Sequence, residues 1–418
     1  MQRLVVLGAG TAGTIVVSKL RNRLPAGEWS ITVVDADDRH LYQPGLLLLP
    51  FGGYTPEELV KSRARFLPHD VELVFGEIDR VAADENQVFL ADGRSLSYDY
   101  LVIATGTTPR PDQTPGMDGE QWRQSVFDFY TLDGALALRD KLAEWEGGRL
   151  VVHISEMPIK CPVAPLEFAF LADAFFEERR MRNRVEITFV TPLDGAFTKP
   201  VAAKQLGAML VDRGIGLEGD FVVDRVDNDR KVLVSMDERE VSFDLLVTVP
   251  VNMGADFVAR SGLGDELNYV PVDKATLQSK AYPNIFALGD ASDIPTSKAG
   301  SVAHFAAEIF VENFCELASG HPMSHSFDGH ANCFIESGHG KGLLIDFNYD
   351  TEPLPGRYPI PRIGPFALLA ETHANHFGKL GFRHVYWHLL LKGWPLPVPA
   401  LMSMAGKHPA EESRGDPR

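Results

Sequence analysis

The chain has 418 residues, of which 45% are apolar and 23% are charged, and its net charge at pH 7 is −17. These values predict a folded globular protein that is long enough for two or three domains. The strong negative charge argues against nucleic acid as the main partner. The three cysteines, Cys161, Cys315 and Cys333, form neither a disulfide framework nor a zinc-binding pattern, so no metal site is expected.

Nothing in the sequence predicts a segment that crosses a membrane or directs secretion. A strand is expected as early as residues 2–7, so we expect no signal peptide before it. No run of 18 or more apolar residues occurs, so no membrane-spanning helix is expected.

The N-terminal residues carry a complete G-x-G-x-x-G pattern in its proper setting. A buried strand is predicted at residues 2–7 and a helix at residues 14–24, and Gly8, Gly10 and Gly13 lie between them. The first glycine permits a tight turn, the second lets a pyrophosphate approach the backbone, and the third lets helix and strand pack closely. The free N–H groups at the start of the helix favour the phosphates of a bound dinucleotide.

A second strand is predicted at residues 29–34, and it ends on Asp35. A carboxylate at this position accepts hydrogen bonds from the ribose of a dinucleotide. Strand, glycine loop, helix, second strand and acid together predict a dinucleotide site.

Two later motifs extend this pattern. A strand at residues 100–103 leads into Thr105 and Gly106, and a short strand at residues 284–288 leads into Gly289 and Asp290, with a helix following at residues 300–317. Alone, Thr105 and Gly106 also fit an ordinary turn.

In this order the motifs resemble the flavoprotein reductases that contain two dinucleotide-binding domains. The resemblance implies FAD rather than NAD at the first site, with Asp290 on the ribityl chain and the following helix pointing its N-terminus at the flavin. The residues expected to contact the cofactor are Gly8, Gly10, Thr11, Ala12, Gly13, Asp35, Gln43, Pro44, Ile78, Thr105, Gly106, Gly289, Asp290 and Lys298.

A second dinucleotide-type domain is expected in the middle of the chain. Strands are predicted at residues 149–154 and 185–190, with a helix at residues 164–180 between them. The turn at residues 155–163 lacks the glycines that a nicotinamide dinucleotide needs, so we expect that this domain keeps the fold without binding NAD(P)H.

A cysteine occupies that turn. Cys161 follows Lys160 and precedes the predicted helix, and both features lower the pKa of a thiol. The alternative is a buried structural cysteine, and the same alternative applies to Cys333. Cys315 lies within a predicted helix and is interpreted as a packing residue.

The whole chain resembles the sulfide:quinone oxidoreductases, which are membrane-bound flavoproteins. The resemblance rests on residues 40–45 (His-Leu-Tyr-Gln-Pro-Gly), on Lys160-Cys161-Pro162, on Lys298-Ala-Gly300 and on the late Cys333. It implies that Cys161 and Cys333 form a redox pair beside the flavin and that Glu167 is the nearby catalytic acid. For Glu167 the alternative is a surface residue in the first turn of a helix.

One departure from that family concerns the flavin linkage. Many members have a third cysteine about thirty residues before the first, whereas residues 121–126 contain none. FAD is therefore expected to be bound non-covalently, and the chain resembles a branch that lacks the third cysteine. Long polysulfur chains built on a third thiol become doubtful.

The C-terminal tail reverses the charge pattern of the chain. Residues 372–409 contain no acid, but they contain Lys379, Arg383, Lys392 and Lys407. An apolar helical side is formed by Phe382, Val385, Tyr386, Leu389 and Leu390, with Trp387 and Trp394 added.

This composition predicts a helix that lies in the membrane interface, and the alternative is packing on the core or on a dimer partner. The family resemblance implies a quinone entrance here, with Phe366 as a wall for the quinone ring and Lys379 as a partner for a quinone oxygen.

The sequence thus predicts an α/β fold with two doubly wound Rossmann-type domains and a C-terminal amphipathic membrane-binding segment. The expected FAD domain is discontinuous and spans residues 1–112 and 282–325. The second domain spans residues 113–281, and the quinone- and membrane-facing segment spans residues 326–418.

The implied reaction is the oxidation of sulfide to sulfane sulfur or polysulfide, with two electrons passing through FAD to a membrane quinone. Hydrosulfide would attack the Cys161–Cys333 disulfide or a sulfur-bridged form of it, and the freed thiolate would attack the flavin. The expected location is peripheral, on the cytoplasmic or inner membrane.

Two rival interpretations remain open at this stage. One is a type-2 NADH:quinone reductase, and the other is a flavoprotein subunit that relays electrons to a partner such as a cytochrome. The sequence also leaves open a homo-oligomer, the membrane face, the quinone type and the length of the sulfur product.

Overall fold

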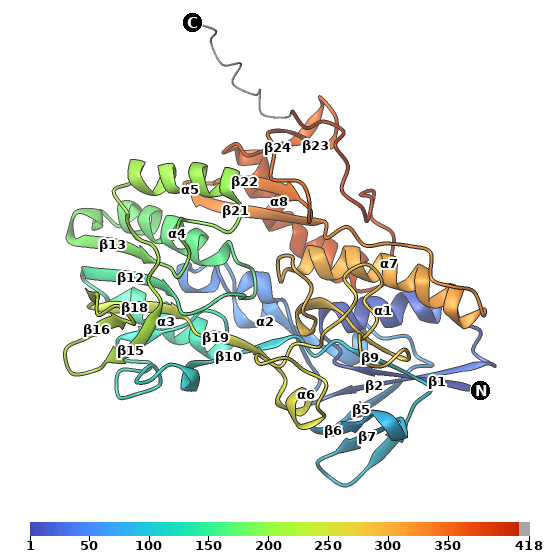
Figure 1. Ribbon diagram of the computed structural model, residues 1–418. Coiled ribbons are helices and arrows are strands. Elements are labelled where there is room, and N and C mark those ends of the chain that lie inside the picture. The colour runs from blue at the N-terminus through green and yellow to red at the C-terminus, as the bar shows by residue number, and fades with distance from the viewer. Residues whose placement is uncertain (409–418) are drawn as a thin grey trace, which may run out of the picture.

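The structure is a computed structural model that describes residues 1–408. Residues 409–418, the end of the predicted C-terminal segment, lie outside the described residues. Figure 1 shows two α/β bodies side by side, with the C-terminal strands and helix lying over both. The α/β class expected from the sequence is confirmed.

The first body is built on a parallel sheet that contains the N-terminal strand. Its strand order is β20-β9-β1-β2-β5, and every neighbouring pair is parallel. In that order, the strands span Ile285–Ala287, Tyr100–Ile103, Gln2–Leu7, Trp29–Asp35 and Glu72–Phe75.

This sheet is closed by a segment from far along the chain. Helices α1 (Thr11–Arg21) and α7 (Gly300–Ala318) lie side by side in both views. The chain therefore leaves the sheet after β9 and returns to it at β20, which carries the late Gly289-Asp290 motif to the glycine loop.

The second body has the same kind of sheet. Its order is β11-β18-β12-β13-β14, again with parallel neighbours. In that order, the strands span Val126–Phe127, Leu245–Val249, Gly148–Ile154, Val185–Val190 and Gly216–Glu218. Its helices are α3 (Leu132–Glu144), α4 (Ala164–Glu178) and α5 (Pro200–Asp212). The strands and the helix predicted between residues 149 and 190 are thus confirmed, with boundaries that shift by two residues at most.

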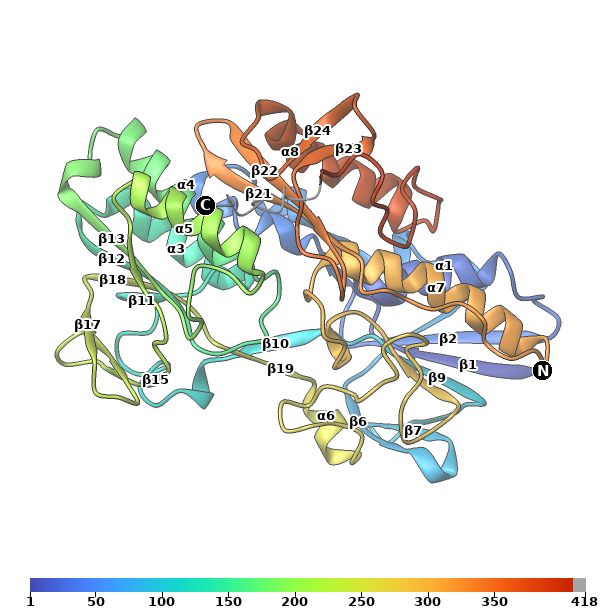
Figure 2. The same cartoon turned by 45° about the horizontal axis from the view of Figure 1, so that its top comes forward.

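Two strands run between the bodies. β10 (Thr107–Arg110) and β19 (Val251–Gly254) pair antiparallel, and Figure 2 shows them crossing from one body to the other. Antiparallel pairs also form two small three-stranded sheets: β6 (Ile78–Ala82), β7 (Gln87–Leu90) and β8 (Ser95–Ser97), and β15 (Val223–Asp227), β16 (Val232–Ser235) and β17 (Glu240–Ser242). The remaining short elements are β3 (Arg39–Leu41), β4 (Val60–Ser62), α2 (Pro56–Leu59) and α6 (Asp256–Arg260).

The C-terminal part is a four-stranded sheet with one helix. The order is β21 (Ala331–Gly338), β22 (Lys341–Phe347), β24 (Gly364–Leu368) and β23 (Gly356–Ile360). Helix α8 (His373–Val385) packs on β21 and β22 and continues into a π-helical turn at Tyr386–Leu390. β21 also packs against α4 of the second body, so this strand brings three parts of the molecule together.

The expected membrane-facing side of the tail is largely covered by protein. Tyr386 is only 2% exposed, and Trp387, Leu390 and Leu391 are equally buried. The carbonyl of Leu391 accepts a hydrogen bond of 2.9 Å from Ser18 on α1. The prediction that Tyr386 and Leu390 face a membrane is therefore wrong. Helical spacing identified an apolar side correctly, but it carried no information about what covers that side.

Three of the four cations of the tail are engaged within the protein. Lys379 pairs with Glu167, Arg383 with Glu58, and Lys407 with Asp346. These three are committed to ion pairs and do not form the basic surface that the sequence predicted, whereas Lys392 is exposed.

We predict that Tyr386→Ser destabilises the fold, because it empties a buried aromatic site. Large-to-small changes of this kind cost about 3–5 kcal/mol. Phe377→Ser is the matched control, because Phe377 lies on the same helix but is 67% exposed, and such surface changes stay within about 0.5 kcal/mol. Denaturant unfolding measures both free energies. Equal losses for the two variants would contradict the packing described above.

Candidate functional site

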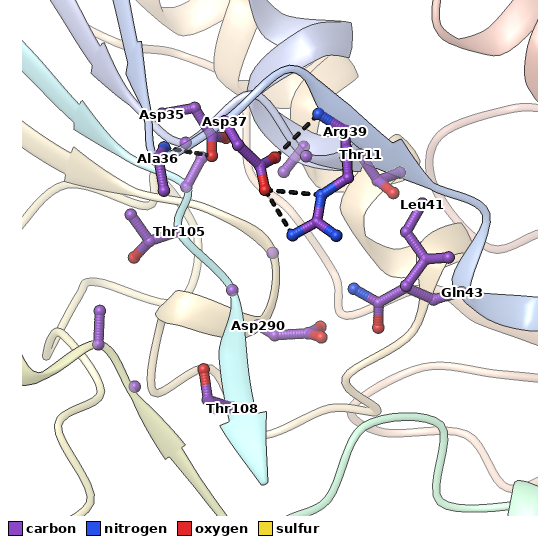
Figure 3. Close-up of a pocket in the computed structure, with 18 of the residues that line it drawn as sticks. Thr11, Asp35, Ala36, Asp37, Arg39, Leu41, Gln43, Thr105, Thr108 and Asp290 are labelled. Carbon is purple, nitrogen blue, oxygen red and sulfur yellow. Dashed lines mark hydrogen bonds and ion pairs between the residues drawn. The ribbon is translucent and has the colours of Figure 1, made fainter. Parts of the chain in front are cut away.

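A cavity of about 770 Å³ opens at the carboxyl ends of the strands of the first sheet. The loops that follow β1, β2, β9 and β20 line it, and the end of β19 contributes from the side of the second body. Figure 3 shows Thr11, Asp35, Gln43, Thr105 and Asp290 around it. The carboxyl ends of parallel strands are where such folds bind ligands, and the volume suits a cofactor.

Most of the residues expected to contact the cofactor line this cavity. They are Gly8, Gly10, Thr11, Ala12, Asp35, Gln43, Ile78, Thr105, Gly106, Gly289 and Asp290. Gly13, Pro44 and Lys298 are not part of the lining.

The glycine loop has the geometry that a pyrophosphate site needs. Gly8 has a φ of +97°, and a Cβ at Gly13 would lie 1.9 Å from the carbonyl oxygen of Gly8, so α1 packs closely on β1 only with glycine there. A Cβ at Gly10 would meet nothing within 4 Å. The backbone at Gly10 is therefore open toward the cavity. It lies at the N-terminus of α1, whose first N–H groups have no side-chain cap and can bind a phosphate.

Asp35 is held firmly at the end of β2. Its carboxylate accepts hydrogen bonds from the N–H groups of Ala9 (2.6 Å) and Ala36 (2.7 Å), and it lies 2.9 Å from the guanidinium of Arg63. Burial raises the pKa of this carboxyl, and Arg63 and the two amides oppose that rise. Sequence reasoning missed Arg63, which also donates to the carbonyl of Ala9, because no motif marks it.

One polar atom in the cavity wall lacks a partner. Among the described residues, the hydroxyl of Thr105 is buried without a hydrogen bond. The space at Gly10 is open, and the start of α7 at Gly300 has no side-chain cap. These residues therefore fit a dinucleotide, which would satisfy the hydrogen-bond donors that lack a partner in the cavity.

The C-terminal tail reaches the glycine loop. The hydroxyl of Tyr386 shares a hydrogen bond of 2.8 Å with Thr11, and the same hydroxyl lies 2.7 Å from Nε2 of His40. The other ring nitrogen of His40 donates to the carbonyl of Ala9 at 3.1 Å. Burial lowers the pKa of His40 to about 3, so the neutral ring holds loop and tail together. No motif in the sequence predicts this network.

The cysteine turn of the second body closes onto the first body. Lys160 pairs with Lys298 in a short parallel bridge, and the N–H of Cys161 donates to the carbonyl of Lys298 at 2.6 Å. Cys161 has a φ of +45°, a conformation that costs a non-glycine residue energy and often marks functional positions. The Nζ of Lys298 itself donates to the carbonyls of Asp290 and Ser292.

Cys161, which is partly buried, and Cys333, which is buried, lie in one neighbourhood with Glu167 and Lys379. Both cysteines are free thiols, as is Cys315. Burial raises the pKa of Cys161, and the charges of Glu167 and Cys333 raise it further. Burial and Glu167 likewise raise the pKa of Cys333 to about 12. Lys379 opposes these increases for both thiols.

The expectation that Lys160 lowers the pKa of Cys161 is therefore wrong. The ammonium of Lys160 lies 5.8 Å from the ring centre of Tyr130 and interacts with Asp290 and Asp128. The start of α4 does act in the expected direction through the N–H of Ala164, but burial outweighs it. The side chains of sequence neighbours need not point to the same place. The cation that lowers the pKa of Cys161 is Lys379, which is far away in the sequence.

Glu167 and Lys379 form an ion pair at this centre. Glu167 is fully buried on α4, and its Oε1 accepts hydrogen bonds from Lys379 and from the N–H of Glu336 at 2.6 Å. Burial raises the pKa of Glu167, whereas Lys379 and that amide counteract the rise. A buried carboxyl with a raised pKa is a candidate for proton exchange at such a site.

The two residues expected to contact quinone, Phe366 and Lys379, both contact Phe334 on one side of this centre. Phe366 packs edge-on to Phe334 with ring centres 5.1 Å apart. Gly378, next to Lys379 on α8, faces both rings, since a Cβ there would lie 2.5 Å from Phe366 and 2.9 Å from Phe334. Phe334 follows Cys333 directly, and sequence reasoning did not single it out.

We predict that Glu167→Gln makes the two buried thiols more reactive, because it removes a charge that raises the pKa of each. The thiolate fraction below the pKa rises about tenfold for each unit that the pKa falls. The measurement is the rate of iodoacetamide alkylation of phosphine-reduced protein in a Cys315→Ser background. Glu178→Gln, at the exposed end of α4, is the control. Unchanged alkylation in the Glu167→Gln variant would contradict the assigned electrostatics.

Comparison with known proteins agrees with this geometry. The family model described as pyridine nucleotide-disulphide oxidoreductase matches residues 2–307. A mitochondrial sulfide:quinone oxidoreductase of Dictyostelium discoideum is 27% identical over 397 residues, covering 94% of this chain and 86% of the relative. A sulfide-quinone reductase of Aquifex aeolicus is 26% identical, with 89% of each chain covered.

The solved structures agree with the fold. The X-ray structure of the sulfide:quinone oxidoreductase from Aquifex aeolicus superposes with a TM-score of 0.79 at 21% identity, covering 94% of this chain and 92% of that chain. The resemblance to sulfide:quinone oxidoreductases that the motifs indicated is confirmed. The chain belongs to the pyridine nucleotide-disulphide oxidoreductase family.

Proposed function

We propose that this protein is an FAD-dependent enzyme that oxidises sulfide and passes the electrons to a quinone. The observation that carries the proposal is the group formed by Cys161, Cys333, Glu167 and Lys379. Cys161 occupies the turn where a nicotinamide-binding domain would have its glycines. Similarity to sulfide:quinone oxidoreductases over nearly the whole chain supports it.

Family membership supports FAD as the cofactor, and the cavity residues fit it. The glycine loop and the start of α1 would hold the pyrophosphate, Asp35 the ribose and Asp290 the ribityl chain. Bound FAD would supply the two-electron chemistry that joins sulfur oxidation to quinone reduction. No cysteine lies before residue 161, so we propose that the linkage is non-covalent.

Sulfur chemistry is proposed to take place on the two cysteines. Hydrosulfide attacks a Cys161–Cys333 disulfide, a new sulfur–sulfur bond forms to one cysteine as the old bond breaks, and the other cysteine leaves as a thiolate. Because burial raises the pKa of both thiols, a free thiolate is costly here. Glu167 would take up or return the proton, and Lys379 would stabilise the negative sulfur.

The quinone is proposed to approach from the side of Phe366 and Lys379. Their closeness to Phe334, which follows Cys333, supports this placement. Lys379 would then act on both reactions, because its ammonium already lies against Glu167.

We predict that sulfide reduces the flavin of the purified protein and that NADH does not. Cys161→Ser and Cys333→Ser should each lower the rate of sulfide-dependent quinone reduction by several orders of magnitude. When residues act as one catalytic unit, the loss of either one removes most of the unit's contribution to the rate. Cys315→Ser is the matched control, since Cys315 lies on α7 beside Arg23 and Glu312, away from the pair. An anaerobic titration gives the answer. Rapid bleaching by NADH alone would favour the type-2 NADH:quinone reductase interpretation.

We also propose that the protein attaches to a membrane surface through exposed apolar residues of the C-terminal part. No helix among residues 1–408 is long and apolar enough to cross a membrane. Large exposed apolar side chains nevertheless occur repeatedly between residues 356 and 404, namely Ile360, Ile363, Phe377, Trp394, Leu401 and Met404. Apolar side chains at an interface each contribute on the order of 1.5–3 kcal/mol when fully buried.

We predict that the triple variant Ile363→Ser, Phe377→Ser, Trp394→Ser loses binding to anionic lipid vesicles in a sedimentation assay. The control variant Val211→Ser, Met236→Ser removes comparably exposed apolar groups from the second body and should bind as before. Flavin reduction by sulfide should persist in both variants, because the changed side chains are at the surface. Vesicle binding that is the same for all three proteins would rule out this attachment.

A further inference from the structure

Oxidation of sulfide by a quinone requires protons to move in and out of a buried site. Hydrosulfide gives up two electrons and one proton (HS⁻ → S⁰ + H⁺ + 2e⁻), and the quinone takes up two electrons and two protons (Q + 2e⁻ + 2H⁺ → QH₂). Each turnover therefore takes one net proton from solvent. Glu167 is fully buried, so it cannot exchange protons with solvent directly.

A second carboxylate lies next to Glu167 on the side of α8. Glu336 on β21 is 2% exposed, and its backbone N–H is the group that donates to Glu167. The negative charge of Glu336 also acts on Lys379 and helps to raise the pKa of that ammonium, against the lowering effect of burial. Burying a carboxylate costs desolvation free energy unless the charge is paired with a partner.

The partner of Glu336 is a histidine that reaches solvent. Nδ1 of His376 on α8 lies 2.8 Å and 3.1 Å from the two carboxylate oxygens of Glu336. The side chain of His376 is 22% exposed. Lys379 is three residues further along the same helix, so His376 and Lys379 lie on one face of α8.

We propose that His376 and Glu336 form the solvent-side end of a proton relay that continues through Lys379 to Glu167. This inference rests on the proposed function, and neither Glu336 nor His376 has a role in the assignments above. His376 exchanges protons with water, Glu336 accepts and returns them, and Lys379 passes them between the two carboxylates on its flexible side chain. Proton transfer creates no new covalent link, and no other reactant is required.

The surroundings leave His376 with one close ionic partner. Besides His376, the titratable groups of α8 are His373, Lys379, Arg383 and His384. The strands packed against α8 add Cys333 and Glu336 on β21 and Lys341 and Asp346 on β22, and Glu167 on α4 and Tyr54 before α2 lie beyond them. Asp346 is occupied by His330 and Lys407. Among the described residues, Glu336 alone pairs with His376.

The test compares His376→Gln and Glu336→Gln with His373→Gln in the complete flavin-loaded protein. His373 is exposed on the first turn of α8 and bonds only a backbone carbonyl, which makes it a matched control. We expect the relay variants to lower kcat by on the order of a hundredfold, with KM for sulfide unchanged and an altered pH profile. Millimolar imidazole should restore turnover in His376→Gln, since a small base can replace the missing ring.

Proton movement is measured separately with a pH-indicator dye in a single anaerobic turnover with sulfide and quinone. The relay predicts that net proton uptake lags in His376→Gln and Glu336→Gln but not in His373→Gln. If kcat and the pH profile of the relay variants match the wild type, the relay is overturned. A loss of activity that accompanies a lower Tm and that imidazole does not rescue would also overturn it and assign the pair a structural role. If the wild type reduces no quinone with sulfide, the proposed function fails first, and the relay fails with it.

Discussion

The buried ion pair between Glu167 and Lys379 is the constraint on which the rest of the site depends. Two charges taken out of water are tolerated only when each compensates the other, and removal of one partner of such a pair costs about 3–5 kcal/mol. Glu167 comes from α4 of the second body and Lys379 from α8. Pairing the two charges fixes α8 against β21, and β21 is the strand that carries Cys333.

The C-terminal part therefore belongs to the active-site architecture as much as to the surface. Tyr386 bonds Thr11 and His40 at the glycine loop, and Lys19 on α1 donates to the carbonyl of Gly393. From the middle of α8, Lys379 reaches the cysteine site. Helix α8 and the turn that follows it thus connect the cavity at the glycine loop with the residues around Cys161 and Cys333, so a change in the tail would alter both places.

The sequence was most informative where a residue type is required by backbone geometry. Gly8 and Gly13 are needed for a positive φ and for close packing, and both requirements are visible in the spacing alone. Strands β1 and β13 were located to the residue from two different patterns. Leu4–Leu7 of β1 form the continuous apolar run of a parallel strand covered on both faces, and β13 begins with an alternation of buried and more exposed residues. Sequence reasoning could not place Arg63, Glu336 or His376, because their roles arise from pairing across long stretches of chain.

The two errors have one physical origin. For Lys160, adjacency in the sequence was taken for adjacency in space, although the side chain points to Tyr130 and the two acids. For Tyr386, an apolar helical side was correctly recognised, but protein rather than lipid covers it. In both cases the local pattern defined the chemistry of a side chain, and only the tertiary structure defined its partner.

The raised pKa values of the two thiols bear on how a buried pair of cysteines can be reactive. Burial disfavours a free thiolate, so the state of lowest cost at this site is one in which sulfur carries no charge, as in a disulfide or a protonated thiol. A nucleophile that opens such a bond leaves a thiolate that is destabilised, and this thiolate is driven to react further or to gain a proton. Glu167 raises the pKa of both thiols while Lys379 lowers it. The ion pair that joins α8 to α4 therefore also acts on the charge state of the two cysteines.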